Sequence, residues 1–560
     1  MIAPARPVFR YPFAWLGLAC FICTFMADGT TESGFSAEAP VLFGGLCLTG
    51  AVLGAFLLPG NIRERLYILI PAAFAAAALG FLALLSGGDP ALLLAAALLF
   101  LMAAGLSLWM SGQLHMRQLL LLLFAAAFCL RLAYILVTPI TVRQHDVGSI
   151  GCGHSHIGYI EYLYNGGSLL LPFDPRSVWQ FYHPPLHHLP AALWMHFQTL
   201  LGFSYERAFE NVQILTLFYS MGTLFIFERL LRRLRLRGAA FVLPMAVVCF
   251  HPTGILFSGS INNDCLSAFL QFGALAAAVR WYDAPGLKNI LYVALLVGGS
   301  MAAKLAGALC APAIALLFLY KWWKNRQETR RYFAWFAAFA AICVPLGLGW
   351  SVLNWVRWGV PLGYVPVLST DNYQYVGMYS PWQRLFDFFG GKDANVFMAF
   401  ADRSGAGYYE YNPFLGLFKT SVFGEFTFFH PESDTVRCQI GLPFATALFF
   451  VNLVCMGVSL LGGGLTLFRK RFVRGDGVLS AFFAILFGVT LFSYINMCFS
   501  APHTCTQNFR YTTPMLLCGA VWLGELIRHT QKRSLGRRGL SVLTAVFCVL
   551  SAFVYTLLLV

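Results

Sequence analysis

The chain has 560 residues, of which 59% are hydrophobic and 11% are charged, with a formal net charge of +14. Apolar runs of about 20 residues, each long enough to cross a bilayer, recur along it. These features exclude a soluble catalytic domain and predict an all-α, polytopic membrane protein. The fifteen cysteines do not indicate a disulfide framework, because most of them fall inside apolar runs.

About fifteen transmembrane helices are expected from the apolar runs. The first is expected to stay in the chain, since further spans follow it at once and no clear small-residue cleavage site closes it. In chain order, the expected spans cover residues 11–27, 40–59, 67–86, 90–110, 117–138, 208–230, 239–257, 263–282, 289–303, 305–321, 333–353, 441–467, 478–498, 511–528 and 540–559.

The composition divides the chain into three parts. Residues 1–116 hold four spans that are rich in Ala, Leu and Gly and nearly free of polar groups, which predicts an N-terminal four-helix membrane module. Residues 117–530 carry the polar features and form the core, and residues 531–560 hold a last span. Two long loops interrupt the core at 139–207 and 354–440. Their mixed aromatic and polar stretches indicate helices that lie in the membrane interface.

The positive charge follows the membrane topology and does not form a nucleic-acid site. With the N-terminus inside, most Lys and Arg residues, including the clusters at 229–237 and 321–331, fall in short loops on one side. This is the positive-inside pattern, and such basic loops have some affinity for anionic lipid. The two long loops fall on the other side. We therefore expect a multi-pass protein of a bacterial cytoplasmic membrane, with its working surface outside and the lipid bilayer as a partner.

The segment 143–188 is the polar island of the chain. It holds half of the twelve histidines and directly follows an apolar helix. Ionisable groups in this position mark a functional site. Cys152, His154 and His156 offer ligands that suit zinc or another divalent cation, but their spacing matches no standard zinc site. The alternatives are that His154 and His183 hydrogen-bond a substrate, or that they only occupy the polar interface.

Several motifs follow one another on the outer side of the expected topology. Asp146 lies in the first large outer loop before a helix that ends as GYIEYLYNGGSLLLP, and HPPLHH follows at 183–188. SINNDCLSAF at 260–269, MAAKLAG at 301–307 and FRYTTP at 509–514 come later. In this order the motifs resemble the GT-C superfamily, membrane glycosyltransferases that use polyprenyl-phosphate sugars. The most similar branch contains the lipid A aminoarabinose transferases and the protein O-mannosyltransferases. The resemblance covers residues 117–530, with His183 where these proteins often have Lys.

The resemblance implies a GT-C fold and a sugar transfer at the outer face of the membrane. The donor would be a polyprenyl-phosphate sugar, and the acceptor a hydroxyl of a glycan, a lipid or a protein. This transfer needs a base, and Asp146 suits that role as a carboxylate at the interface that water-soluble acceptors can reach. A nearby carboxylate also stabilises an oxocarbenium-like transition state, and one in-line displacement would invert the anomeric carbon. No certain cofactor is expected, and a divalent cation remains an open alternative.

Other residues on the same side are expected to bind substrate. Lys304 would pair with the donor phosphate, unless it only reaches the headgroups. Arg510, next to Tyr511, would clamp the phosphate, unless it is only an interfacial Arg at a helix start. Asp264, after Asn263, would orient the acceptor or a cation in the site, unless it only caps its helix. The remaining candidates for substrate binding are His154, His156, Tyr182 and His183.

Two other classes of function fit an apolar chain of this length. A transporter or flippase for a lipid-linked sugar would suit the number of spans, but transporters usually place charged sites near the membrane midplane in broken helices. Here the polar residues gather in outer loops, which favours an enzyme. A non-catalytic membrane assembly subunit is the third class, and it would be indifferent to loss of Asp146.

Overall fold

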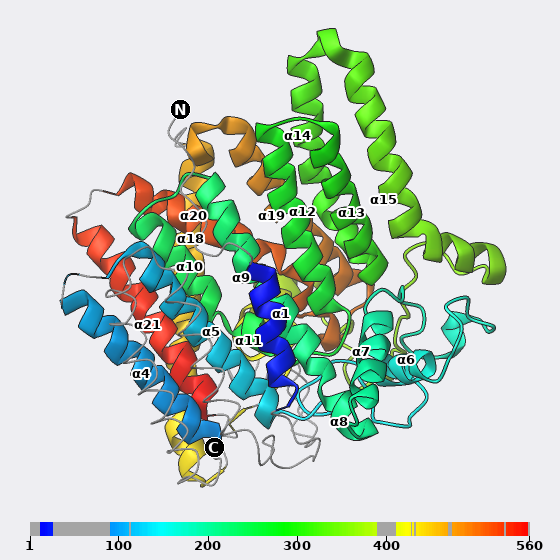
Figure 1. The fold of residues 1–560 in the computed structure, drawn as a ribbon, viewed down its shortest axis with the longest axis horizontal. Helices are drawn as coiled ribbons and strands as arrows, with labels where there is room; N and C mark the ends of the chain where they lie inside the picture. The colour runs from blue at the N-terminus through cyan, green and yellow to red at the C-terminus, as the bar shows by residue number, and fades with distance from the viewer. Residues whose placement is uncertain are drawn as a thin grey trace.

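The computed structural model describes residues 12–25, 90–110, 112, 114–388, 410–426, 428–429, 433–468, 473–530 and 534–557. Within these residues the regular structure is helical, apart from an isolated β-bridge between Tyr375 and His503 (Figure 1). The α-helices are α1 (Pro12–Cys23), α4 (Pro90–Met110), α5 (Met116–Val137), α6 (Ser155–Tyr164), α7 (His188–Leu200), α8 (Tyr205–Glu210), α9 (Val212–Arg233), α10 (Ala239–Phe250), α11 (Pro252–Gly259), α12 (Asp264–Asp283), α13 (Leu287–Ala303), α14 (Ala311–Lys324), α15 (Thr329–Trp358), α16 (Pro381–Phe386), α17 (Pro413–Phe423), α18 (Val436–Phe468), α19 (Gly477–Ser500), α20 (Pro514–His529) and α21 (Leu535–Leu557). The 3-10 helices are η1 (Pro175–Ser177), η2 (Leu305–Cys310), η3 (Arg326–Glu328), η4 (Val473–Gly475), η5 (Thr504–Thr506) and η6 (Phe509–Thr512).

Seven helical segments of the described residues are long and apolar enough to cross a membrane, and the bent pair α10–α11 raises this number to eight. The chain is a multi-pass membrane protein. Each span expected outside residues 26–89 has a helix or a broken helix at its position. The spans expected at 40–59 and 67–86 lie outside the described residues. The total of about fifteen is therefore not confirmed, since some of the helices, such as α13 with 17 residues, are short for a crossing.

The helices pack around one large apolar core. Helix α13 lies against α12 and α15, and α9 lies against α12, α11, α5 and α1 (Figure 1). In a second group, α20 and α21 each pack against α10 and α18. Of the expected N-terminal module, only α1 and α4 belong to the described residues, and α4 packs on α5 and α21. The site described below lies where these groups meet the loops that carry α6, α17 and η6.

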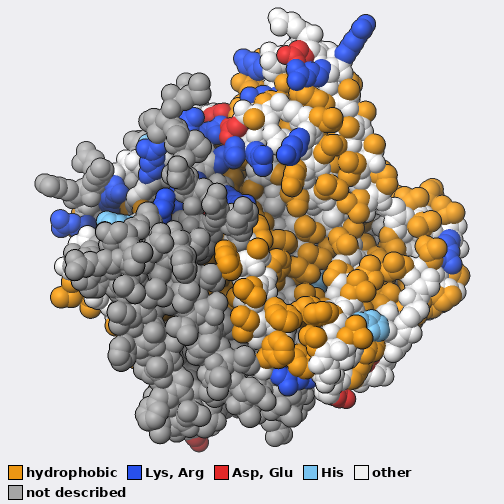
Figure 2. All heavy atoms as spheres, viewed as in Figure 1, with side chains coloured by type: hydrophobic (Ala, Val, Ile, Leu, Met, Phe, Trp, Pro, Cys, Tyr) orange, Lys and Arg blue, Asp and Glu red, His pale blue; other side chains and the backbone are white. Residues whose placement is uncertain are grey.

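The visible surface separates charge from apolar side chains. Figure 2 shows Lys and Arg gathered at the upper end of α14 and α15, above a broad hydrophobic face. The basic residues of that connection are Lys321, Lys324, Arg326, Arg330 and Arg331. Large apolar side chains such as Leu295, Leu319 and Phe333 are more than half exposed. An exposed apolar face of this extent is what lipid contact requires.

A break between α10 and α11 positions the residues of α11. The two helices meet at His251-Pro252 with a bend of 43°, because Pro252 cannot donate the backbone hydrogen bond that would continue α10. The freed carbonyl of Cys249 accepts a hydrogen bond from Nη1 of the fully buried Arg131, at 2.8 Å, and Arg131 Nε donates to Ser220 Oγ at 2.9 Å. The guanidinium therefore provides a hydrogen bond to a backbone carbonyl that the break would leave without a donor.

Gly254 lets Arg131 come close to α11. A Cβ atom there would lie 2.5 Å from Arg131 Nη2. The Ser220 hydroxyl, in turn, donates to the carbonyl of Gly254 at 2.7 Å. α5, α9 and α11 are thus joined by one buried polar contact, which holds α11 in place beside the site.

Candidate active site

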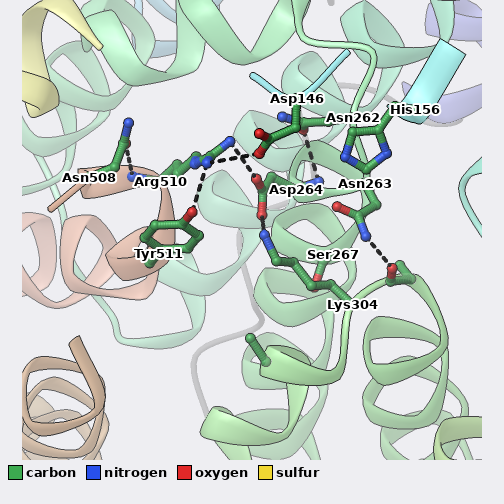
Figure 3. Close-up of polar contacts among 12 residues, drawn as sticks. Asp146, His156, Asn262, Asn263, Asp264, Ser267, Lys304, Asn508, Arg510 and Tyr511 are labelled. Atoms are coloured by element: carbon green, nitrogen blue, oxygen red, sulfur yellow. Dashed lines mark hydrogen bonds and ion pairs between the residues drawn. The ribbon is translucent and has the colours of Figure 1, made fainter. Parts of the chain in front are cut away.

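Four segments that are distant in sequence bring charged side chains to one place (Figure 3). Asp146 comes from the loop between α5 and α6, and Asp264 is the first residue of α12. Lys304 sits between α13 and η2, where the backbone is extended, with φ −155°. Arg510 and Tyr511 lie in η6. We expected four charged residues on one side of the protein: Asp146, Asp264, Lys304 and Arg510. In the structure their side chains also contact one another.

Arg510 is the centre of this group. Its Nη2 lies 3.5 Å from Asp146 Oδ2 and 3.7 Å from Glu425 Oε1, and its Nη1 lies 3.6 Å from Asp264 Oδ2. Nη2 also donates to the Tyr511 hydroxyl at 2.7 Å. The Arg510 side chain is only 6% exposed, whereas that of Asp146 is 40% exposed. A buried cation thus faces three carboxylates, of which Asp146 is the one that solvent and solutes can reach.

Lys304 completes the group through Asp264. Its Nζ donates to Asp264 Oδ1 and lies 4.9 Å from the centre of the Tyr511 ring. Asp264 therefore pairs with both cations, and its carboxylate does not serve as a simple helix cap. The backbone N–H of Asp264 is instead bound by Asn262 Oδ1 at 3.1 Å. Lys304 is directed toward this carboxylate, so the alternative in which it reaches only the headgroups does not describe this arrangement.

Glu425, His145 and Asn508 belong to the site and were missed as candidates. His145 Nδ1 lies 2.9 Å from Glu425 Oε2, and Asn508 Nδ2 donates to Glu425 Oε1 at 2.8 Å. Asn508 Oδ1 accepts from the backbone N–H of Arg510 at 2.8 Å, which fixes the turn that carries the arginine. The available signal was an acidic residue in the second long loop, two residues after the end of α17. Nothing in the local sequence connects it to Arg510.

The electrostatics of these loop residues keep them charged. Burial alone would raise the pKa of Glu425, but His145, Arg510 and the Asn508 hydrogen bond together lower it. Burial alone would lower the pKa of Arg510, but Tyr511 and the three carboxylates raise it well above its usual value. The site therefore holds fixed charges of both signs in a largely dry environment, where their mutual interactions are strong.

Local backbone geometry presents Asp146. The residue has a left-handed conformation, with φ 56°, which L-residues other than Asn, Asp and glycine rarely adopt. Its carbonyl accepts the backbone N–H of His156 at 3.2 Å, and the carbonyl of Val147 accepts that of Ile157 at 3.0 Å. The loop is thereby folded back onto the start of α6, and the carboxylate points toward Arg510 (Figure 3).

Four histidines of the polar segment lie close to one another. His156 and His188 are buried, and His156 Nδ1 lies 2.8 Å from His188 Nε2. His183 stacks on His156 with 5.9 Å between ring centres, and His187 Nε2 lies 2.6 Å from the carbonyl of Ile261. Burial, aided by Lys304 and Arg510 and opposed by Asp264, lowers the pKa of His183 to about 3. Burial lowers the pKa of His187 to about 4 and those of His156 and His188 well below the usual value.

Cys152, His154 and His156 do not converge. Cys152 Sγ donates to the carbonyl of His154, and His154 Nδ1 faces the Ser155 hydroxyl at 2.8 Å. His156 turns inward to His188 instead. Among the residues that the structure describes, no three His, Cys, Asp or Glu side chains are arranged to hold a metal ion. These three side chains, the alternative set of metal ligands, thus have other neighbours.

The other candidates border the charged group. Asn263 is buried, and its Nδ2 donates to the carbonyl of Ala303 at 3.0 Å, so it supports the break that carries Lys304. Tyr182 lies against His183 and Tyr364, with ring centres at 4.6 and 5.8 Å. Burial and the nearby Asp146 raise its pKa. His154 stays on the surface at the start of α6, away from these contacts.

No protein-family model matches the chain, and no curated protein matches its sequence. Among solved structures, the fold is similar to a crystal structure of ArnT from Cupriavidus metallidurans bound to undecaprenyl phosphate. The two share 14% sequence identity over 80% of this chain and 77% of ArnT, with a TM-score of 0.42. At this level of similarity neither the family nor the function passes from one protein to the other, and both have to be inferred from the residues.

Proposed function

We propose that the protein is an integral-membrane glycosyltransferase of GT-C type. It moves a sugar from a polyprenyl-phosphate donor to an acceptor hydroxyl of a glycan, a lipid or a protein, at the outer face of a bacterial cytoplasmic membrane. Asp146 is the base, and the anomeric carbon is inverted. The observation that carries this proposal is the convergence of Asp146, Asp264, Lys304 and Arg510 from four separate segments.

The arrangement supplies the two things that the transfer needs. The acceptor oxygen forms a bond to the anomeric carbon while the bond between that carbon and the phosphate oxygen breaks. The acceptor proton goes to the Asp146 carboxylate, which is the solvent-accessible member of the group. The electron pair leaves with the polyprenyl phosphate, whose added negative charge is stabilised by Arg510 and Lys304.

Asp264 has a positioning role in this scheme. It lies between the ammonium of Lys304 and the guanidinium of Arg510 and holds the two cations side by side. Fixed charges need no reorganisation when the leaving phosphate develops its charge, and this preorganisation is the main source of electrostatic catalysis. Glu425 and Asn508 hold Arg510 from the other side.

The location of the group favours an enzyme over a transporter. Asp146 and Arg510 lie in loop segments next to α6 and α20, and Asp264 and Lys304 lie at helix ends. The clustered Lys and Arg residues of the α14–α15 connection lie at the opposite end of α12 and α13 (Figures 1 and 2). With the positive-inside rule, this supports an outer position for the site.

The direct test uses the full-length protein in lipid nanodiscs with a radiolabelled polyprenyl-phosphate sugar. Mass spectrometry of outer-surface glycans and lipid-linked sugars, with and without the gene product, identifies the acceptor. Nanodiscs that hold the wild-type protein, supplied with cell extract as the source of acceptor, should convert the labelled donor to polyprenyl phosphate and a labelled product. Nanodiscs that hold Asp146→Asn should not. Movement of the intact donor across liposomes without product formation would show a transporter instead.

A further inference from the structure

The candidate site holds more carboxylates than cations. Asp146, Glu425 and Asp264 lie 3.5, 3.7 and 3.6 Å from the Arg510 guanidinium, and Lys304 pairs with Asp264 (Figure 3). Among the residues that the structure describes, these ion pairs thus join one Arg and one Lys to three carboxylates. The phosphate of a donor brings a further negative charge into the same place. In a largely dry site this excess of negative charge opposes phosphate binding.

His145 is the side chain that can change this balance. Its Nδ1 lies 2.9 Å from Glu425 Oε2, and Glu425 Oε1 lies 3.7 Å from Arg510 Nη2. The His145 and Glu425 side chains are only 10% and 18% exposed, so solvent screens their interaction little. Histidine is the side chain that changes its charge most readily between about pH 5 and 8. A proton on His145 would neutralise Glu425 and leave equal numbers of positive and negative charges in the site.

Charged groups face His145 from several elements. They are Arg143 and Asp146 of its own loop, Asp264 of α12, Glu425 after α17 and Arg510 of η6. The other residues that line the small space beside His145, from α11, α17 and the turn before η6, carry no titratable side chain. Burial alone would raise the pKa of Glu425, but His145 and Arg510 lower it. The Glu425 carboxylate therefore stays ionised, and the imidazole is the group that takes up a proton.

Arg143 does not supply the missing positive charge. Its Nη2 donates to Thr138 Oγ1 at 2.8 Å, and its guanidinium lies over the rings of Tyr134 and Phe428. Among the described residues it forms no ion pair with a carboxylate of the site. Its charge is thus directed to neutral partners at the start of the loop.

The residues on both sides of His145 hold the imidazole at Glu425. Gln144 Nε2 donates to the carbonyl of Gly259, and Gln144 Oε1 accepts from the backbone N–H of Ile261 at 3.2 Å. On the other side, Asp146 contacts Arg510. The loop is thereby fixed to the segment between α11 and α12 and to η6, so a change in the charge of His145 acts directly on Glu425.

We propose that binding of the polyprenyl-phosphate donor is coupled to the uptake of one proton by His145. The proton comes from solvent and neutralises Glu425, so that Arg510 is available to the phosphate. It returns to solvent when the polyprenyl phosphate leaves. The inference rests on the proposed function and deepens it, because it adds a pH-dependent regulation of the same site. His145 and Glu425 are positioning residues, since they act on the phosphate through Arg510.

The experiment measures binding of undecaprenyl methyl phosphate to the full-length protein in nanodiscs between about pH 6 and 9. This sugar-free phosphodiester keeps a single negative charge over the whole range, so any proton that is taken up binds to the protein. Calorimetry in buffers of different ionisation enthalpy counts the protons. The variants are His145→Gln and Glu425→Gln, which break the same contact but remove opposite partners. His196→Gln, on the exposed face of α7, is the matched control.

The dissociation constant of the wild-type protein should rise with pH by up to about tenfold per pH unit, the limit for uptake of one proton. Where the slope is steepest, calorimetry should count close to one proton. His145→Gln should bind weakly at every pH and take up no proton. Glu425→Gln should also lose most of the pH dependence, but it should bind more tightly than the wild type at pH 9, because one carboxylate is absent. His196→Gln should match the wild type.

Three results would overturn the inference. The first is a wild-type dissociation constant that does not change with pH, which needs no variant and is independent of how the variants fold. The second is proton uptake that persists in His145→Gln. The third is weaker binding in both folded variants at pH 9, which assigns the pair a structural role only. In each case transfer from a sugar-bearing donor by the wild-type protein leaves the proposed function standing, whereas absence of both diester binding and transfer overturns both.

Discussion

Nη2 of Arg510 and Oδ2 of Asp146 lie 3.5 Å apart, although 364 positions separate the two residues in sequence. The contact ties the loop before α6 to the turn before α20, and it holds a solvent-accessible carboxylate beside a buried cation. A base in this position lies next to the group that receives the leaving phosphate. The pair therefore joins the two halves of the proposed reaction.

Asp146→Asn should abolish transfer, because the amide has the shape of the carboxylate but cannot accept the acceptor proton. Loss of a general base typically lowers the rate by about 10²–10⁴-fold. Binding of the polyprenyl-phosphate donor should stay within a few-fold of the wild type. Single-turnover transfer and equilibrium donor binding, measured on the same preparation, check both expectations. Full activity in Asp146→Asn would remove Asp146 from the mechanism.

Arg510→Lys should lose most of the activity although it keeps the charge. One ammonium cannot reach Asp146, Asp264 and Glu425 together, whereas the planar guanidinium contacts all three. We expect kcat to fall by more than tenfold and the melting temperature to drop, since the buried carboxylates of Asp264 and Glu425 each lose one of their partners. Arg357→Lys, on an exposed helix end, is the control. Unchanged kcat in Arg510→Lys would show that the spread of contacts is unimportant.

Lys304 and Asp264 should behave as a coupled pair. Lys304→Met leaves Asp264 with Arg510 alone, and loss of one partner of a buried ion pair costs about 3–5 kcal/mol. Adding Asp264→Asn should restore a large part of the free energy of unfolding, but it should not restore transfer, because the phosphate-binding cation is absent. Denaturation in detergent and transfer assays on the four members of the cycle separate the two effects. Additive losses of stability in the double variant would contradict direct coupling.

Acid should destabilise the protein through the buried histidines. The pKa values of His183 and His187 are lowered to about 3 and 4, so these side chains stay neutral in the folded state well below pH 6. In the unfolded state they take up protons near pH 6.5. Their contribution to stability is therefore complete above pH 6.5 and is lost as the pH falls toward 4, by about 1.4 kcal/mol per pH unit for each histidine.

The measurement is the melting temperature between pH 7.5 and 5. The slope should be smaller in His188→Gln, which removes one buried histidine, than in the wild type. His154→Gln is the matched control, because His154 lies on the surface. An identical slope in His188→Gln and His154→Gln would contradict the assignment.

The sequence located the candidate residues better than it described their contacts. Charge distribution placed Asp146, Lys304 and Arg510 on one side, since that depends only on the order of spans and loops. Their meeting depends on how α5, α12, α13 and η6 pack, which no local pattern encodes. Glu425 was missed for the same reason, because its partners, His145 and Arg510, come from distant segments.

The histidines show the opposite limitation. His156 and His183 were expected to bind substrate because they lie in the polar segment, whereas His187 and His188 carried no assigned role. In the structure His187 and His188 are buried, and His188 contacts His156 from α6. Burial of neighbouring polar residues in a short loop follows from tertiary packing, which outweighs the local polarity that suggested exposure.

The buried polar contact that joins α5, α9 and α11 at the break between α10 and α11 limits which substitutions this chain can accept. Arg131, Ser220 and Gly254 form one contact in which each residue is fitted to the other two. A side chain at 254 would strike the guanidinium, and a shorter residue at 131 would leave the Cys249 carbonyl unpaired in the apolar core. These positions should therefore tolerate substitution only in combination. Helix α11, which this contact joins to α5 and α9, would then be inherited as a unit with them.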